Sequence, residues 1–136
     1  MFDTECKSVA LIEKKRPKWQ SGKLNAIGGH VEDDEFSLSA MVREFYEETG
    51  LETKHEQWLH VTQLQGDGYI VDFYTSIGPI RDLKTTTDEQ IIVFGIDCIT
   101  DENAIPNLTY LIPMALLRLK ALSSVLVVTE GTACLR

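Results

Sequence analysis

Apolar and polar positions along the chain follow two periods, one typical of strands and one typical of helices. Two of the predicted strands flank Gly66-Asp67-Gly68, and the second of them alternates apolar with polar side chains, which predicts a β-hairpin. The predicted strands are residues 8–13, 24–27, 60–65, 69–76 and 90–99. Residues 38–49 and 108–122 have the helical period. Residues 123–136 fit either an added strand or a loose tail.

The first predicted helix has clear start and stop signals. Ser37 is a good N-cap residue, and Gly50 is the natural left-handed residue after the last turn. The buried face consists of Leu38, Met41, Val42, Phe45 and Thr49. The second helix carries its apolar residues at 111, 112, 115, 116, 119 and 122. Because proline is tolerated only in a first turn, this helix is expected to begin near Pro113.

The first helix also carries three carboxylates on a second face. Glu44, Glu47 and Glu48 stand at positions i, i+3 and i+4, about 120° around the helix from the apolar stripe. Such carboxylates repel each other by roughly a few tenths of a kcal/mol per pair. A divalent cation would convert this repulsion into affinity, and hard oxygen ligands on a rigid helix suit Mg²⁺ or Mn²⁺. Charge runs are also common on plain solvated surfaces.

The spacing of residues around this helix is far more specific than the charge run. The fixed positions are Gly29, then Glu35 after five residues, Arg43-Glu44 after seven more, Phe45, Glu47-Glu48, Gly50 and Leu51. This pattern, from Gly29 to Leu51, resembles the complete Nudix box. The predicted elements around the box also resemble the Nudix hydrolase superfamily.

The resemblance implies an α/β fold, the Nudix-type α/β/α sandwich, in which a mixed sheet lies between helices. The family fold usually has a strand before residues 8–13, where this chain has only Met1-Phe2, so we expect either a truncated first strand or a protein start further upstream. The chain has no internal repeats and no linker, so residues 1–136 are interpreted as a single domain.

The resemblance also implies an enzyme that hydrolyses the diphosphate bond of a nucleoside diphosphate linked to another moiety, with Mg²⁺ (or Mn²⁺) as cofactor. Glu44 and Glu48 are the predicted direct metal ligands, and Glu47 is a third ligand or the general base. Arg43 is expected to orient box carboxylates. Family members often supply a further acid from beyond the box, as a ligand or base, and Glu89 is the residue predicted for that role, with Asp88 as the alternative.

The loop before the box contains candidates for substrate binding. Five of the thirteen basic residues stand at positions 14, 15, 16, 18 and 23. This segment is either a solvated surface loop or a basic rim that contacts the phosphates of the substrate. Trp19 is either a core anchor or a platform for a base. Trp58, Tyr69 and Tyr74 are further candidates for stacking, with core or edge packing as the alternative. The predicted substrate-binding residues are Gly28, Gly29, Lys23, Trp19 and Tyr69.

The small size of the chain and the aromatic residues favour a small-molecule nucleotide substrate. A nucleoside triphosphate or an 8-oxo-purine triphosphate, releasing monophosphate and pyrophosphate, is the first expectation. ADP-ribose and dinucleoside polyphosphates are alternatives. Two hypotheses of another class stay open: a non-catalytic nucleotide-sensing module on the same fold, and a small surface-interaction domain. Mg²⁺-dependent turnover would separate the enzyme from both.

Composition limits the other classes of function. The net charge of −8 argues against a general DNA-binding protein, which needs a basic surface. Cys6, Cys98 and Cys134 are far apart and lack CxxC spacing, so neither a zinc site nor a disulfide framework is indicated, and Cys98 is expected to be a buried thiol. With no visible signal peptide and no apolar run of membrane-spanning length, a cytoplasmic protein is expected. A homodimer is compatible with the sequence.

Overall fold

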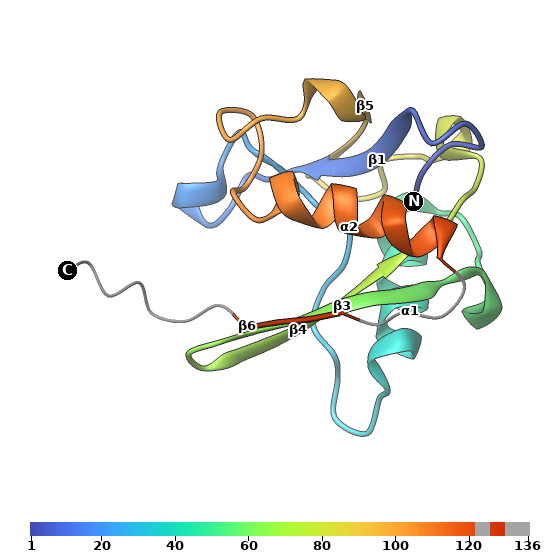
Figure 1. Cartoon of the computed structure of the whole chain (residues 1–136), viewed down its shortest axis with the longest axis vertical. Coiled ribbons are helices and arrows are strands. Elements are labelled where there is room, and N and C mark those ends of the chain that lie inside the picture. Colours follow the sequence, from blue (N-terminus) through green and yellow to red (C-terminus); the bar gives the residue numbers. More distant parts are fainter. Residues whose placement is uncertain (122–125, 130–136) are drawn as a thin grey trace.

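The computed structural model describes residues 1–121 and 126–129, and Figure 1 shows the order of the elements along the chain. The strands are β1 (Ser8–Glu13), β2 (Leu24–Asn25), β3 (Leu59–Gly66), β4 (Tyr69–Thr75), β5 (Gln90–Gly95) and β6 (Leu126–Thr129). The helices are α1 (Ser37–Thr49) and α2 (Leu108–Lys120). Each predicted strand and helix is therefore present, and β6 lies within the segment that the sequence left undecided.

The strands form two three-stranded sheets. Strand β1 is central in the first and runs antiparallel to β2 and β5. Strand β3 is central in the second, antiparallel to β4 and parallel to β6. The backbone of Phe2 bridges to Val9 in β1 and to Ile77 after β4, so it connects the two sheets. This bridge lies at the position where the sequence leads us to expect the end of a first strand.

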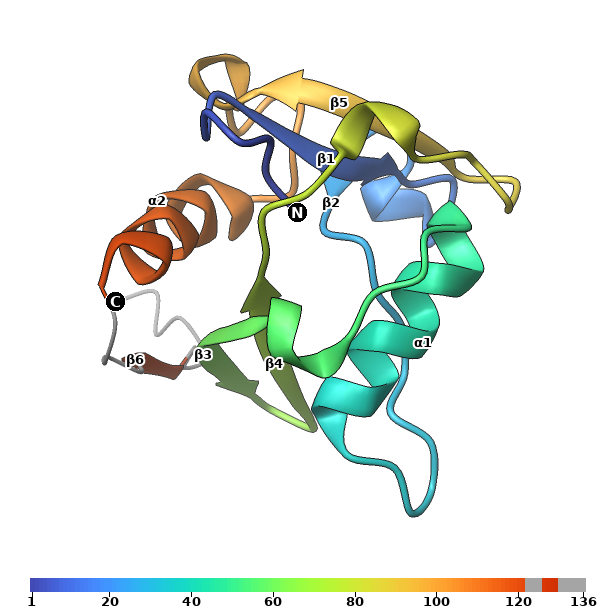
Figure 2. The ribbon, with the colours of Figure 1, turned by 90° about the vertical axis from the view of Figure 1, so that its right-hand side faces the viewer.

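The apolar core consists of two clusters between the strands and the helices. One packs α2 against the strands and includes Leu11, Leu64 and Leu108. The other packs α1 and includes Phe45 and Trp58, whose rings meet edge-to-face with centroids 4.9 Å apart. Figure 2 shows α1 and α2 on opposite sides of the strands. The predicted α/β class with helices on both sides is confirmed.

The start of α1 differs from the prediction. The N-cap residue is Phe36, and no side-chain hydrogen bond caps the helix. Ser37 lies in the first turn, where its hydroxyl is 2.7 Å from the Tyr74 hydroxyl. The predicted N-cap at Ser37 is therefore wrong, because this serine bonds across to strand β4. The end of the helix is as predicted, since Gly50 is left-handed with a φ of 69°.

Two expectations in the second half of the chain are also wrong. Helix α2 begins at Leu108 and contains Pro113, because deep burial of Leu108 and Leu111 holds the first turn despite the proline. Strand β5 ends at Gly95, and a 3₁₀ turn follows that leaves Cys98 exposed. The apolar sequence run continues beyond the strand, which is why a buried thiol was expected. No helix among residues 1–121 is long and apolar enough to cross a membrane.

Candidate active site

The predicted box forms a loop and a helix, as expected, and two glycines bring the loop close to the helix. Gly28 has a φ of 151°, a conformation that side chains disfavour. The Glu44 carboxylate lies against Gly29 so closely that a Cβ atom at position 29 would overlap it. The N–H of Gly28 donates to Oε2 of Glu48 at 3.1 Å. The loop backbone therefore meets two of the three predicted metal ligands.

Arg43 is the centre of a charged network on α1. Its guanidinium donates to Glu35 through Nε (3.1 Å) and Nη2 (3.0 Å), and to Glu44 through Nη1 (2.9 Å). Nη1 also lies 3.3 Å from Glu47, and Nη2 donates to the carbonyl of His30 at 3.0 Å. Hydrogen bonds from Arg43 lower the pKa of Glu35. One side chain thus connects the box loop to two of the predicted metal ligands.

Glu48 is in a different environment from the other box carboxylates. Burial raises its pKa to about 7, and the negative charges of Glu44 and Glu89 act in the same direction. The Gly28 hydrogen bond and the positive charge of Lys14 oppose this shift. A carboxylate that is half-buried and short of positive charge gains strongly from a cation. Glu48 is therefore the box residue with the clearest electrostatic need for a metal ion.

Glu89, the acid predicted from beyond the box, is buried near Glu48 and tightly held. It accepts hydrogen bonds from Lys14 Nζ at 2.5 Å and from the backbone N–H groups of Lys15 and Arg16 at 2.7 and 3.3 Å. Burial raises the pKa of Glu89, but these hydrogen bonds together lower it by more, so its pKa lies below the usual value. Asp88 beside it pairs with Arg16 at the surface.

The donor set fits a hard divalent cation, because every candidate ligand is a carboxylate oxygen. Among residues 1–121 and 126–129, no three His, Cys, Asp or Glu side chains are gathered closely enough to hold a metal ion as they stand. The contacts explain why: Glu44 and Glu47 point to Arg43, and Glu48 points to Gly28. Binding a metal would require these flexible carboxylates to turn toward a common point.

A cleft of about 1080 Å³ begins at the box loop and continues between the sheets. Four of the five predicted substrate-binding residues line it: Trp19, Gly28, Gly29 and Tyr69. Trp19 is 66% exposed, so it is not a core anchor. Lys23 is not among the residues that line the cleft, and its Nζ donates to the carbonyl of Asp101. Trp58 is 5% exposed and packs on Phe45, so it is unsuited to stacking on a ligand.

Several polar residues that line the cleft were not singled out from the sequence as site residues, among them His30, Asp72 and Asn107. Oδ1 of Asn107 is buried without a hydrogen-bond partner, which is unusual unless a ligand or water satisfies it. Asp72 sits on β4 and bonds to His60 on β3. Their place in the cleft depends on how distant segments pack, and local sequence patterns do not report that packing.

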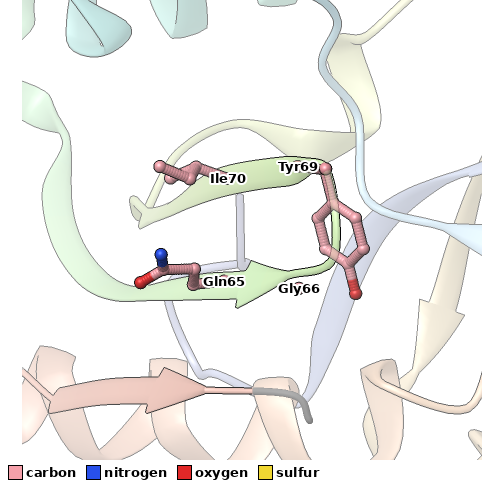
Figure 3. A pocket seen from close by; sticks show the side chains of 5 residues that line it. Gln65, Gly66, Tyr69 and Ile70 are labelled. Atoms are coloured by element: carbon pink, nitrogen blue, oxygen red, sulfur yellow. The ribbon is translucent and has the colours of Figure 1, made fainter. Parts of the chain in front are cut away.

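A second hollow of about 440 Å³ lies at the tip of the β3–β4 hairpin. Figure 3 shows Gln65, Gly66, Tyr69 and Ile70 around it. The ring of Tyr69 lies over Gly66, where a Cβ atom would overlap it. The same tyrosine lines the large cleft. The glycine therefore allows the ring to fold back along the hairpin, which sets the position of this wall of the cleft.

The NUDIX domain model matches residues 1–109. The chain belongs to the Nudix family. A solved structure described as MutT, from a study of the enzymes of Aliivibrio salmonicida and Vibrio cholerae, is similar, with 21% sequence identity, a TM-score of 0.62, and coverage of 83% of this chain and 91% of that one. No curated protein matches the sequence.

Family membership confirms the interpretation of the box, and the similar structure shows the same fold. The protein is a Nudix hydrolase, an enzyme that acts on phosphoric anhydrides. Nudix hydrolases generally use divalent metal cations, in agreement with the carboxylate donor set. The individual roles of Arg43, Glu44, Glu47, Glu48 and Glu89 stay predictions, and so do those of the cleft residues.

Proposed function

We propose that this Nudix hydrolase is a Mg²⁺-dependent nucleoside triphosphate pyrophosphohydrolase, which releases a nucleoside monophosphate and pyrophosphate. The observation that carries the proposal is that a charged region, formed by the box, lies next to an apolar cleft. The box glycines Gly28 and Gly29 line a mostly apolar cleft that is large enough for a nucleoside. The carboxylates of Glu48 and Glu44 contact these two glycines. Phosphates suit the charged, metal-binding end, and a base and sugar suit the cleft.

Glu44 and Glu48 would hold the metal ion, with Glu47 and Glu89 beside them. The bound ion would neutralise part of the phosphate charge and would lower the pKa of a bound water molecule. In the reaction, water attacks a phosphorus atom, the P–O bond of the anhydride breaks, and pyrophosphate leaves. The attacking water gives its proton to a carboxylate. Glu47 is exposed and suits that role, whereas Glu89 is buried, tied by three donors and weakly basic, so it suits a ligand or positioning role.

The walls of the cleft support a nucleotide over a smaller anhydride. Trp19 is exposed at the cleft, as a platform for a base would be. The basic loop is partly used within the protein, since Lys14 pairs with Glu89 and Arg16 pairs with Asp88. Lys15 and Lys18 are exposed beside them and would attract a polyanion. An 8-oxo-purine triphosphate would bind in the same way as the unmodified one.

The alternatives differ in what lies beyond the second phosphate. ADP-ribose and dinucleoside polyphosphates carry a second sugar or nucleoside, which the open end of the cleft at Trp19 would have to accept. A non-catalytic sensing module would need none of the box carboxylates, yet Glu44, Glu47 and Glu48 are all present and Arg43 holds two of them. The intact carboxylate set favours the enzyme.

The test is hydrolysis of a nucleotide panel in Mg²⁺ and in chelator. The panel would contain canonical and 8-oxo triphosphates, ADP-ribose, a dinucleoside polyphosphate and a nucleotide sugar. We expect Mg²⁺-dependent release of pyrophosphate from at least one triphosphate, at a higher kcat/KM than for the other classes. Preferred turnover of ADP-ribose or a dinucleoside polyphosphate would replace the proposed substrate. Binding without turnover would support the sensing module.

A further inference from the structure

The large cleft has one acidic side chain on its wall that the proposed hydrolysis does not use. Among the described residues that line the cleft, Asp72 is the only Asp or Glu, and no Lys or Arg is present. A carboxylate there opposes a polyanionic substrate, because charges interact more strongly in a partly desolvated cleft than in water. Its presence therefore favours a ligand whose neighbouring part carries N–H donors.

Asp72 is held in place by its neighbours on β3. His60 Nε2 and Gln63 Nε2 lie 2.9 and 3.1 Å from the same oxygen, Oδ1. These two contacts from β3 both use Oδ1, and Ser37 on α1 also hydrogen-bonds to the carboxylate. Burial raises the pKa of Asp72, but hydrogen bonds from His60, Gln63 and Ser37 lower it more, so its pKa lies below the usual value and the carboxylate is ionised at neutral pH. An ionised carboxylate only accepts hydrogen bonds.

Asp72 lies near the first turn of α1, whereas Glu48, a predicted metal ligand, is in the last turn. Tyr74, two residues further along β4, bonds to Ser37 in the first turn of α1, whereas Glu48 is in the last turn. At the rise of an α-helix, Ser37 and Glu48 are about 16 Å apart along the axis. A nucleotide whose phosphates lie at Glu48 can therefore extend its base toward Asp72.

We propose that Asp72 selects the base of the substrate by accepting hydrogen bonds from a purine edge with two adjacent N–H donors, the pattern of guanine. This inference rests on the proposed function, since it requires a nucleotide in the cleft. Adenine and cytosine place a ring-nitrogen lone pair beside their amino group, and uracil and thymine flank their ring N–H with two carbonyl oxygens. Each of these edges sets a lone pair against the carboxylate, whereas guanine does not.

The test compares kcat/KM for the triphosphates of guanosine, inosine, xanthosine and adenosine in the wild type and in Asp72→Asn. Inosine lacks the 2-amino group, and xanthosine has a carbonyl oxygen in its place. The wild type is expected to prefer guanosine by roughly 10- to 100-fold, the range for one good base contact. Asparagine offers one acceptor and one donor, so the variant is expected to shift toward xanthosine by a similar factor.

A merely structural Asp72 would give a different result, because its loss would lower all four rates alike and leave their ranking unchanged. Asp67→Asn is the matched control. It removes the same charge from the exposed turn of the same hairpin, and it is expected to leave the ranking as in the wild type. Thermal unfolding of each variant checks that the fold is intact.

Binding of the four monophosphates in chelator, measured by calorimetry, separates this inference from the proposed function. A guanine preference that Asp72→Asn moves toward xanthine, without any hydrolysis by the wild type, would support base selection and reject the hydrolysis. Hydrolysis with an adenine preference, or with a ranking that Asp72→Asn leaves unchanged, would overturn base selection and keep the hydrolysis. Neither hydrolysis nor a base preference would overturn both.

Discussion

The carboxylate of Glu44 occupies the space that a side chain at Gly29 would need. The first glycine of the box therefore has a steric role: it allows a predicted metal ligand to lie against the loop backbone. Arg43 holds the same carboxylate from the other side, at 2.9 Å. The position of Glu44 is thus set by a missing Cβ atom and by a neighbouring guanidinium.

Gly29→Ala is expected to displace the Glu44 carboxylate while leaving the fold intact, since the end of a flexible side chain can move. We expect roughly a 10- to 100-fold loss in Mg²⁺ affinity, the usual range when the support of a metal ligand is disturbed. Calorimetric titration with Mg²⁺ measures this. Gly95→Ala is the control, because a Cβ there would meet Cys98 only at an ordinary 3.8 Å. Unchanged Mg²⁺ affinity in Gly29→Ala would show that the contact with Gly29 does not position Glu44 for the metal ion.

The buried carboxylate of Glu48 predicts an unusual pH dependence of stability. Its pKa in the folded protein is about 7, against an ordinary value of 4.5. A carboxyl group with a raised pKa binds protons more tightly in the folded state, so its contribution is fully present below about pH 4.5 and is lost as the pH rises through 7. The metal-free protein should therefore lose stability across this range, on the order of 1–2 kcal/mol after solvent screening is discounted.

Chemical denaturation at a series of pH values in chelator checks this prediction. Glu48→Gln should flatten the curve between pH 5 and 8 and should stabilise the metal-free protein at pH 8. The same substitution should reduce hydrolysis by orders of magnitude. Glu52→Gln, which removes an exposed carboxylate nearby in the sequence, is the control. If Glu48→Gln kept the pH slope of the wild type, the raised pKa of Glu48 would be wrong.

The box helix could be predicted almost to the residue because its signals are local. The apolar period, the left-handed Gly50 and the spacing of the acids are all readable along one segment. The same reasoning misplaced the helix start, because Ser37 bonds to Tyr74, which is 37 positions away. Local capping rules assume that a serine has no better partner, and here strand β4 provides one.

The cleft could be predicted less well than the box, because it depends on the pairing of distant strands. Asp72 meets His60 only through the register of β3 and β4. Asn107 reaches the cleft through the packing of the segment before α2. Trp19 and Trp58 both line the cleft, yet Trp19 is 66% exposed and Trp58 only 5%. Tertiary contacts decide such differences, and periodicity does not record them.

Arg43 is expected to be irreplaceable by lysine. The guanidinium makes bonds in several directions at once, to Glu35, Glu44, Glu47 and the carbonyl of His30. A lysine ammonium keeps the charge but lacks the planar fork. Arg43→Lys should therefore lower kcat by at least about 100-fold and destabilise the fold by roughly 1–3 kcal/mol. Arg81→Lys, at an exposed arginine, should change neither. Full activity of Arg43→Lys would show that charge alone is sufficient.

Trp19 gives the clearest separation between stability and substrate binding. Its side chain is 66% exposed and lines the cleft, so removing it should change the free energy of unfolding by no more than about 0.5 kcal/mol. If a base stacks on the indole, Trp19→Ala should raise KM roughly 10-fold, because stacking on an aromatic ring contributes about 1–3 kcal/mol per base. Trp19→Phe keeps an aromatic face and should recover most of the affinity. Steady-state kinetics on the preferred nucleotide measure both variants, and denaturation measures their stability. An unchanged KM in Trp19→Ala would place the base deeper in the cleft, away from this loop.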